Sequence, residues 1–208
     1  MARMAMHDLD EEEQGRLAAT IAWLEKAGPD DWHRVALDFN WSEPLYLLDW
    51  IARQTDCDMA TALTIFWKGE PTAWLKEEGS GNKKPNGFSY LNQKICAYIA
   101  DRIAAGGYTR SEIAFTPDTW TKKDYVDLVA QEKALAKPNF RAHPNLIHKR
   151  GGRKIVNDAR FYARYPKEFH YSFNCELPGD TPRSVALMER VKSIEQATLR
   201  LLPSWLRG

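Results

Sequence analysis

The sequence predicts a mainly α-helical protein: a single compact helical domain with a basic, partly irregular C-terminal extension. Three observations predict this class. Apolar residues recur every three or four positions in most segments, which places them along one face of a helix. Capping residues such as Asp and Ser precede these segments, and Gly or Pro follows them. Finally, 44% of the 208 residues are hydrophobic, which is enough for one core of ordinary size.

The first helix is expected over residues 9–26. Its apolar stripe consists of Leu17, Ile21 and Leu24. Acidic residues crowd its first turn, where the helix dipole favours negative charge, and Gly28-Pro29 ends it. A second, shorter helix follows, with Asp30 or Asp31 as its N-cap.

The centre of the domain is expected around a third and a fourth helix. Ser42 is the expected N-cap of the third, with the following Glu and Pro in its first two positions. The run Met59–Trp67 is apolar nearly all round, which is typical of a buried helix. Asp56 or Asp58 stands in position to cap it. We therefore expect the core to form around this run.

The next part of the chain alternates helices with irregular stretches. A short helix opens at Glu70-Pro71, and residues 79–87 form the clearest loop. A longer helix over residues 88–103 ends at Gly106-Gly107, because glycine adopts the left-handed conformation that often terminates helices. A further helix is expected over residues 118–136.

Beyond residue 137 the periodic signal is weaker. Pro138 and Pro144 bracket a coil, and the basic stretch after it is expected to become helical from Lys154 onward. A brief strand is expected at residues 170–173, and a last helix begins at Thr181-Pro182.

Composition limits the classes of function. The net charge is +1, so no global field draws the molecule to nucleic acid or membrane. No stretch approaches the ~20 apolar residues that a membrane span needs, and the N-terminus carries an acidic run instead of a secretory signal. The three cysteines are far apart in the sequence: Cys57, Cys96 and Cys175. They predict neither a disulfide framework nor a zinc site, and we expect a cytoplasmic protein without metal or cofactor.

The tripeptide Asp56-Cys57-Asp58 is the first candidate site. Two carboxylates two residues apart are suited to hold a divalent cation or to share a proton, although a hard cation requires more oxygen ligands than this stretch supplies. The alternative is that one Asp caps the buried helix and the other is solvated. Cys57 is either a nucleophile activated at a helix N-terminus or a small buried thiol.

The second candidate is a basic segment that follows the helix expected over residues 118–136. Its six candidate residues are Lys149, Arg150, Arg153, Lys154, Arg160 and Arg164. Phe161, Tyr162 and Tyr165 interleave with them, and basic groups beside aromatic rings can grip phosphates and stack bases. No P-loop, helix-turn-helix, zinc-finger or RNP signature accompanies them. The segment is therefore a solvated face, a surface for an acidic protein partner, or a nucleic-acid site.

Histidine and tryptophan give weaker signals. His143 and His148 lack further ligands for a metal, which favours a structural or surface role. The chain has eight Trp, which are expected mainly in the core because they bury a large apolar area. Trp is also enriched at protein interfaces, and Trp41 is our candidate for a partner contact.

Several stretches support a family resemblance. They are His33–Trp41, Leu48–Ile51, Asp56–Trp67, and the long helix ending in Gly106-Gly107-Tyr108 with the following Ile113–Pro117. Together they resemble an uncharacterised bacterial family, the domain of unknown function numbered 4274, over residues 32–117. The resemblance implies a small helical domain and no established activity, so it assigns no catalytic residue. Such domains look like those near bacterial toxin–antitoxin and secreted-effector loci.

These observations divide the chain into an acidic N-terminal helix packing on the core (residues 1–31), a helical core domain (32–117) and a helical, basic C-terminal part (118–208). The function expected first is that of a protein-binding module, such as an immunity or antitoxin-type inhibitor. Two alternatives remain open: a nucleic-acid-binding protein that uses residues 149–164, and an enzyme with its site near Asp56–Asp58.

Overall fold

The computed structural model describes residues 10–77 and 87–157, together with residues 162, 165 and 166. Within them the chain forms seven α-helices and no strand of a sheet, only isolated β-bridges. The helices are α1 (Glu11–Leu24), α2 (Pro29–Asp38), α3 (Tyr46–Arg53), α4 (Met59–Lys68), α5 (Pro71–Trp74), α6 (Gly87–Ala104) and α7 (Thr119–Ala134), and a short 3-10 helix, η2 (Pro144–Leu146), follows. The predicted mainly α-helical class is confirmed.

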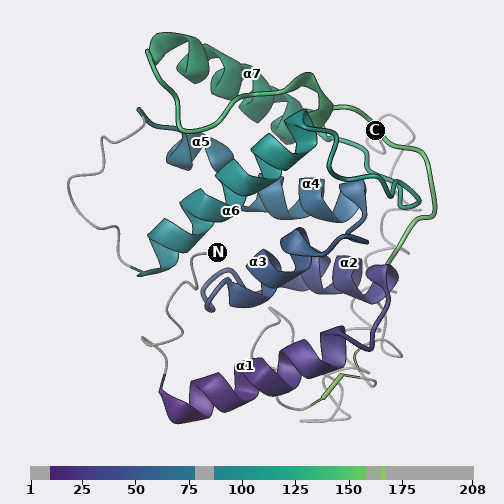
Figure 1. The fold of residues 1–208 in the computed structure, drawn as a ribbon. Coiled ribbons are helices and arrows are strands. Elements are labelled where there is room, and N and C mark those ends of the chain that lie inside the picture. The colour runs from purple at the N-terminus through teal and green to yellow at the C-terminus, as the bar shows by residue number, and fades with distance from the viewer. Residues whose placement is uncertain (1–9, 78–86, 158–161, 163–164, 167–208) are drawn as a thin grey trace, which may run out of the picture.

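The helices are stacked along one direction of the molecule (Figure 1). Helix α1 lies at one end beside α3, α4 and α6 cross in the middle, and α5 and α7 lie at the opposite end. Helix α4 contacts α2, α3, α5 and α6. Among the described residues, no helix is both long enough and apolar enough to cross a membrane.

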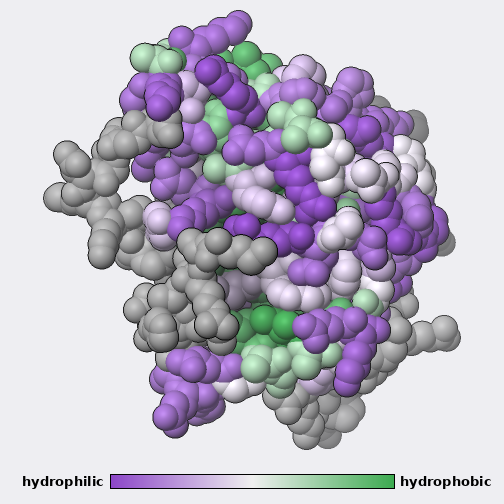
Figure 2. Space-filling model, in the orientation of Figure 1, coloured by the Kyte–Doolittle hydropathy of each residue, from purple (hydrophilic) through white to green (hydrophobic). Residues whose placement is uncertain are grey.

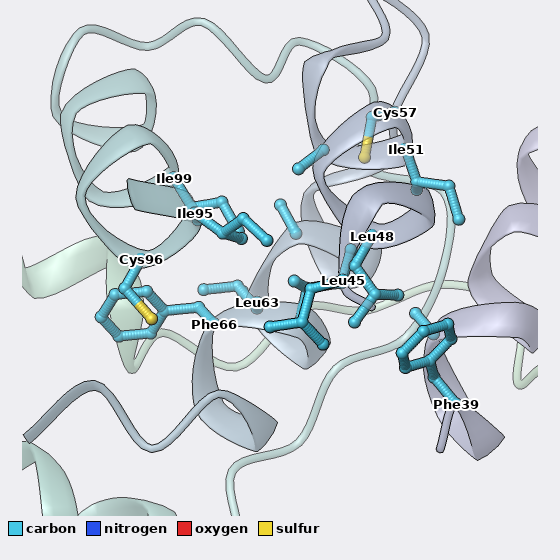
Figure 3. Close-up of a cluster of buried hydrophobic side chains, with 14 of the residues drawn as sticks. Phe39, Leu45, Leu48, Ile51, Cys57, Leu63, Phe66, Ile95, Cys96 and Ile99 are labelled. Atoms are coloured by element: carbon cyan, nitrogen blue, oxygen red, sulfur yellow. The ribbon is translucent and has the colours of Figure 1, made fainter. Parts of the chain in front are cut away.

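The core forms around α4, as the sequence predicts. Seven of its ten residues are buried, because the helix is apolar on nearly every side. The ring of Phe66 in α4 meets two others edge-on: its centroid lies 5.1 Å from that of Trp67 and 6.1 Å from that of Phe140. Figure 3 shows α3, α4 and α6 contributing side chains to this cluster, together with Phe39 just after α2.

Tryptophans connect the helices through their indole N–H groups. Trp32 donates to the carbonyl of Leu24 at 2.9 Å, and Trp67 donates to the carbonyl of Leu146 at 2.7 Å. A buried indole needs such an acceptor, since an unpaired N–H in the core is costly. The expectation that Trp mainly fills the core holds for most of the described tryptophans, which are buried or packed against the core.

The helix starts depend on capping, and two expected caps were wrong. Helix α2 begins at Pro29 with Gly28 as its N-cap, so Asp30 and Asp31 lie inside its first turn. Proline suits the first helical position because its missing N–H would have no partner there. Helix α3 begins only at Tyr46, because the backbone after Asn40 folds into a turn instead.

The turn at Asn40 explains why Ser42 is not the N-cap of α3. The N–H of Ser42 donates to the Asn40 side chain at 3.1 Å, and the N–H of Glu43 donates to the Asn40 carbonyl at 2.9 Å. Asn side chains stabilise such turns by bonding to the backbone two residues on.

Other boundaries agree with expectation. Asp58 caps α4, and α6 is closed by a bond of 2.8 Å from the Gly107 N–H to the Arg102 carbonyl. Helix α7 lies within the expected range 118–136, with Asp118 as its N-cap instead of its first residue. Gly106 has φ +70°, the left-handed conformation that glycine adopts at low cost. Most of the expected loop at residues 79–87, the strand at 170–173 and the last helix lie outside the described residues.

The helix expected from Lys154 is absent over residues 154–157, which have no regular secondary structure. The reason lies just before them, where the backbone is paired with another segment. The Arg150 N–H donates to the Phe115 carbonyl at 2.8 Å, and the Arg153 N–H donates to the Glu112 carbonyl at 2.8 Å. This pairing holds the chain extended, so it cannot wind into a helix there.

Arg102 of α6 closes the C-terminal end of α3. One guanidinium nitrogen donates to the carbonyls of Ala52 and Gln54 at 2.9 and 3.0 Å. The guanidinium also lies 4.1 Å from the ring centroid of Tyr108, whose hydroxyl donates to the Ala52 carbonyl at 2.8 Å. The positive charge therefore meets the negative end of the helix dipole and the orphan carbonyls at the helix end.

We expect Arg102→Ala to lower the free energy of unfolding by about 2 kcal/mol, because several charge-assisted hydrogen bonds are lost at a helix terminus. Arg102→Lys should recover only part of this, since an ammonium cannot both fork to two carbonyls and stack on a ring. Urea unfolding followed by circular dichroism measures the change. Arg141→Ala, which removes a guanidinium that is 68% exposed and pairs with Glu132, is the control and should cost at most about 0.5 kcal/mol. Equal losses for the two Ala variants would contradict the assigned role.

Candidate functional site

The candidate tripeptide Asp56-Cys57-Asp58 links α3 to α4. Asp56 is exposed, whereas Cys57 and Asp58 are fully buried. One Asp58 oxygen accepts from the Ala60 N–H at 2.8 Å, and the other accepts from the N–H groups of Glu112 and Ile113 at 2.7 and 3.2 Å. Asp58 is therefore the cap of α4 and also fastens the segment after α6 to it. Its oxygens are directed at the backbone, which is the capping alternative foreseen in the sequence.

Cys57 is a buried thiol beside this cap. Burial raises the pKa of the Cys57 thiol to about 12, with the nearby Asp58 carboxylate adding to the effect and Arg102 opposing it. The thiolate is the reactive form of cysteine, so a thiol that stays protonated at neutral pH is a weak nucleophile. Its Sγ lies 3.6 Å from the Asp58 carbonyl, in a short contact with the backbone. Cys96 is likewise free and buried.

A buried polar pair that the sequence did not reveal joins α2 to α4. His33 Nδ1 and Thr61 Oγ1 are 3.0 Å apart and hydrogen-bonded, and both residues are buried. Desolvation lowers the pKa of His33 to about 4, and the charges of Arg34 and Lys68 lower it further while Asp30 opposes them. The imidazole is therefore neutral at physiological pH. No sequence signal could find this pair, because the two residues are 28 positions apart.

The carboxylates and histidines of this region lie apart from one another. Within the part of the chain that the structure describes, no three His, Cys, Asp or Glu side chains gather closely enough to hold a metal ion. His143 instead caps η2, where its Nδ1 accepts from the Asn145 N–H at 3.2 Å.

The described part of the basic segment, residues 149–157, forms an extended strap along one edge of the molecule. In Figure 1 the green chain returns from α7 and runs past the ends of α4 and α2 toward α1. Lys149 and Lys154 are exposed on it, Arg150 is half-buried, and Arg160 and Arg164 lie outside the described residues. The strap bridges Phe115 and Ile113 through Arg150 and Arg153. The exposed lysines thus sit on backbone that is held in place.

Arg153 is engaged within the protein. Its guanidinium donates to both Asp30 oxygens at 2.7 and 2.9 Å and to Glu112 at 3.1 Å. This two-pronged contact fixes the strap to the start of α2. Gly152 permits the approach, because its φ is +145° and a Cβ there would meet the Glu112 carbonyl oxygen at 2.4 Å.

The end of the strap is fastened to α2 as well. Asn157 donates to the Arg34 carbonyl at 2.9 Å and to the Asp38 carboxylate at 2.7 Å, and the Tyr162 hydroxyl donates to the same carboxylate. The Tyr165 ring lies against Trp23 of α1 with centroids 4.5 Å apart. Two aromatic residues considered for base stacking therefore pack on the protein itself.

Trp41, the candidate partner contact, lies in the turn after α2. Its ring is half-buried and meets Phe39 edge-on at 6.3 Å, and its indole N–H has no hydrogen-bond acceptor among the described residues. Asp38, which holds the end of the strap, is three residues before Trp41. The structure thus brings the turn of Trp41 and the end of the strap to the same end of α2.

Taken together, these features define a helical protein whose buried Cys, His and Asp groups serve the fold and whose edge carries a fixed basic strap. Residues 27–99 match the model of the family described as Domain of unknown function (DUF4274). The match confirms the family resemblance and extends from the turn before α2 into α6, so α1, α7 and the strap lie outside it. A comparison with curated proteins finds no match. A comparison with solved structures finds none either.

Proposed function

We propose that this protein is a binding module that recognises another protein stoichiometrically, in the manner of an immunity or antitoxin-type inhibitor. One observation carries the proposal: Lys149 and Lys154 project from backbone that β-bridges and the Arg153–Asp30 pair hold in place. Binding to a preorganised surface loses little conformational entropy, and the positive charges of the two exposed lysines steer an acidic partner toward it. Trp41 is the proposed apolar contact at the end of the strap.

The side chains that a catalytic site at Asp56–Asp58 would use favour a binding protein over an enzyme. Asp58 is occupied by three backbone N–H groups, and Cys57 is buried with a raised pKa. We therefore do not propose an enzyme at Asp56–Asp58. The free, buried thiols of Cys57 and Cys96 fit the cytoplasmic location that we propose for the protein.

Nucleic acid is the alternative partner for the same lysines. The strap offers nucleic acid fewer free positive charges than the sequence suggested, because Arg153 is paired with Asp30 and Glu112. Tyr162 and Tyr165, the rings that could have stacked on bases, are packed on α2 and α1.

The test begins with purification of the full chain from its source organism and mass spectrometry of what is bound at equal stoichiometry. The bound protein is then purified and its affinity measured by calorimetry. We expect Lys149→Glu/Lys154→Glu to weaken binding by about tenfold or more at low salt, and the effect should shrink as salt screens the charges. Lys26→Glu, an exposed lysine after α1, is the matched control and should leave the affinity unchanged.

Either of two outcomes would overturn the proposal. One is the absence of any equimolar protein. The other is equal affinity of the double variant and the control. Tight binding of a single-stranded DNA probe, with an affinity that falls steeply with salt and is lost in the double variant, would establish the nucleic-acid alternative instead.

A further inference from the structure

The outer face of α7 carries large apolar side chains in water. Trp120 is 74% exposed and Val126 is 64% exposed, whereas Leu128 is the one residue of this helix that is buried. In Figure 2 the end of the molecule formed by α7 shows a few hydrophobic residues among hydrophilic ones. A Trp this exposed offers a partner a large apolar area to bury, and Trp is enriched among the residues that contribute most to binding at interfaces.

The exposed residues of α7 follow the spacing of a helix-pairing seam. The seam runs along positions separated by three and four residues in turn, and every member is exposed: Trp120, Lys123, Asp127, Ala130 and Ala134. Val126 flanks this seam, and the residues that face the body of the protein, such as Tyr125 and Leu128, lie on the other side of the helix. Spacings of three and four are those at which two helices pack side by side.

The seam is complementary to itself when two copies run antiparallel. Centred on residue 125, an antiparallel pair sets Trp120 opposite the partner's Ala130 and Lys123 opposite the partner's Asp127. The large half of the seam thus meets the small half, and each lysine meets a carboxylate. Val126 lies beside the partner's Val126, since the flanking positions of an antiparallel pair face their own copies. Antiparallel helices also oppose their dipoles favourably.

We infer that a second copy of this chain docks on α7, with the two α7 helices antiparallel across a two-fold axis. Such an interface is closed, because the same patch serves both subunits. It is also small, since a helix of 16 residues is about 24 Å long and stable dimers usually bury about 800 Å² on each partner. The expected association is therefore reversible and in the micromolar range. This inference is independent of the proposed function, which uses the strap.

Asp127 in the middle of the seam argues against nucleic acid as the occupant, because a carboxylate there repels phosphates. Lys123 already pairs with Asp127 of its own helix at 2.6 Å. In the dimer each Lys123 can pair with the second copy's Asp127 instead, which leaves no charge unpaired.

Sedimentation velocity of the full chain from about 1 to about 300 µM tests the inference. We expect a concentration-dependent dimer, and Trp120→Ala should weaken it at least about tenfold. Lys123→Asp and Asp127→Lys should each abolish the dimer, because each places like charges opposite one another, and the combined Lys123→Asp/Asp127→Lys variant should restore it. Lys122→Asp, next to the seam with the same change in charge, is the control and should dimerise normally. Circular dichroism verifies that each variant folds.

A cross-link gives a second measurement that does not depend on affinity. In a Cys175→Ser background, Val126→Cys should form a disulfide-linked dimer under dissolved oxygen, whereas Val156→Cys, exposed to 56% on the strap, should not. Cys57 and Cys96 are buried and do not interfere. The inference is overturned if the chain stays monomeric throughout, if the swapped variant remains monomeric, or if both cysteine variants cross-link at the same rate.

Discussion

Asp58→Ala is expected to lower the free energy of unfolding by about 3–5 kcal/mol, because the substitution leaves several backbone N–H groups without an acceptor. In the native protein the carboxylate accepts from Ala60 at the start of α4 and from Glu112 and Ile113 in the segment after α6. A single side chain thus caps the central helix and holds a segment 54 residues away. Urea or thermal unfolding followed by circular dichroism measures the loss.

Asp56→Ala provides the control, because Asp56 is two residues away, has the same charge and is exposed. It should change stability by no more than about 0.5 kcal/mol. Asp58→Asn should fall between the two, because the amide keeps one acceptor oxygen but turns an NH₂ group toward backbone donors. If Asp58→Ala were as stable as Asp56→Ala, the carboxylate would not be the fastening that the structure indicates.

Asp58 also shows which parts of the fold a sequence can predict. The apolar run Met59–Trp67 and the acidic residue before it are local signals, and both the buried helix and its cap are confirmed. Helix α7 is also found where the local periodicity predicted a helix. Local rules failed where another local interaction was stronger. The turn at Asn40 displaced the expected cap at Ser42. Helix α2 starts at Pro29 with Gly28 as its N-cap, so Asp30, the expected N-cap, lies inside the helix.

Long-range contacts are what the sequence could not supply. The bond between Arg153 and Asp30 joins residues 123 positions apart. The sequence suggested that Arg153 contacts a partner, whereas in the structure this bond attaches the strap to α2. The pairing of the strap with residues 112–115 likewise overrides the helix expected from Lys154. The sequence also gives no sign that Asp58 contacts Glu112 and Ile113, since no periodicity or spacing connects these residues.

The buried pair of His33 and Thr61 makes the stability of the protein depend on pH in a defined direction. Burial lowers the pKa of His33 to about 4, from 6.5 in the unfolded chain. Between these values the unfolded state binds a proton that the folded state does not, so lowering the pH favours unfolding. This contribution to stability is complete above about pH 7, decreases as the pH falls from 6.5 to 4, and does not decrease further below that.

A difference of about 2.5 pKa units corresponds to a loss of roughly 3 kcal/mol across this window. The measurement is the free energy of unfolding at several pH values between 4 and 7, for the wild type and for His33→Asn. The Asn amide occupies the place of Nδ1 and retains a hydrogen bond to Thr61 without a titrating group. The curve of the variant should therefore be flatter by this amount, because carboxylates that also titrate in this range affect both proteins equally.

His148→Asn is the matched control, since His148 is exposed on the approach to the strap, and its curve should follow that of the wild type. Parallel curves for His33→Asn and the wild type would mean that His33 does not remain neutral in the folded protein. In that case the imidazole must reach water or a carboxylate through an opening between α2 and α4. A flatter curve for His33→Asn alone establishes that α2 and α4 exclude water around the pair, so the tight contact between these helices makes the core sensitive to acid.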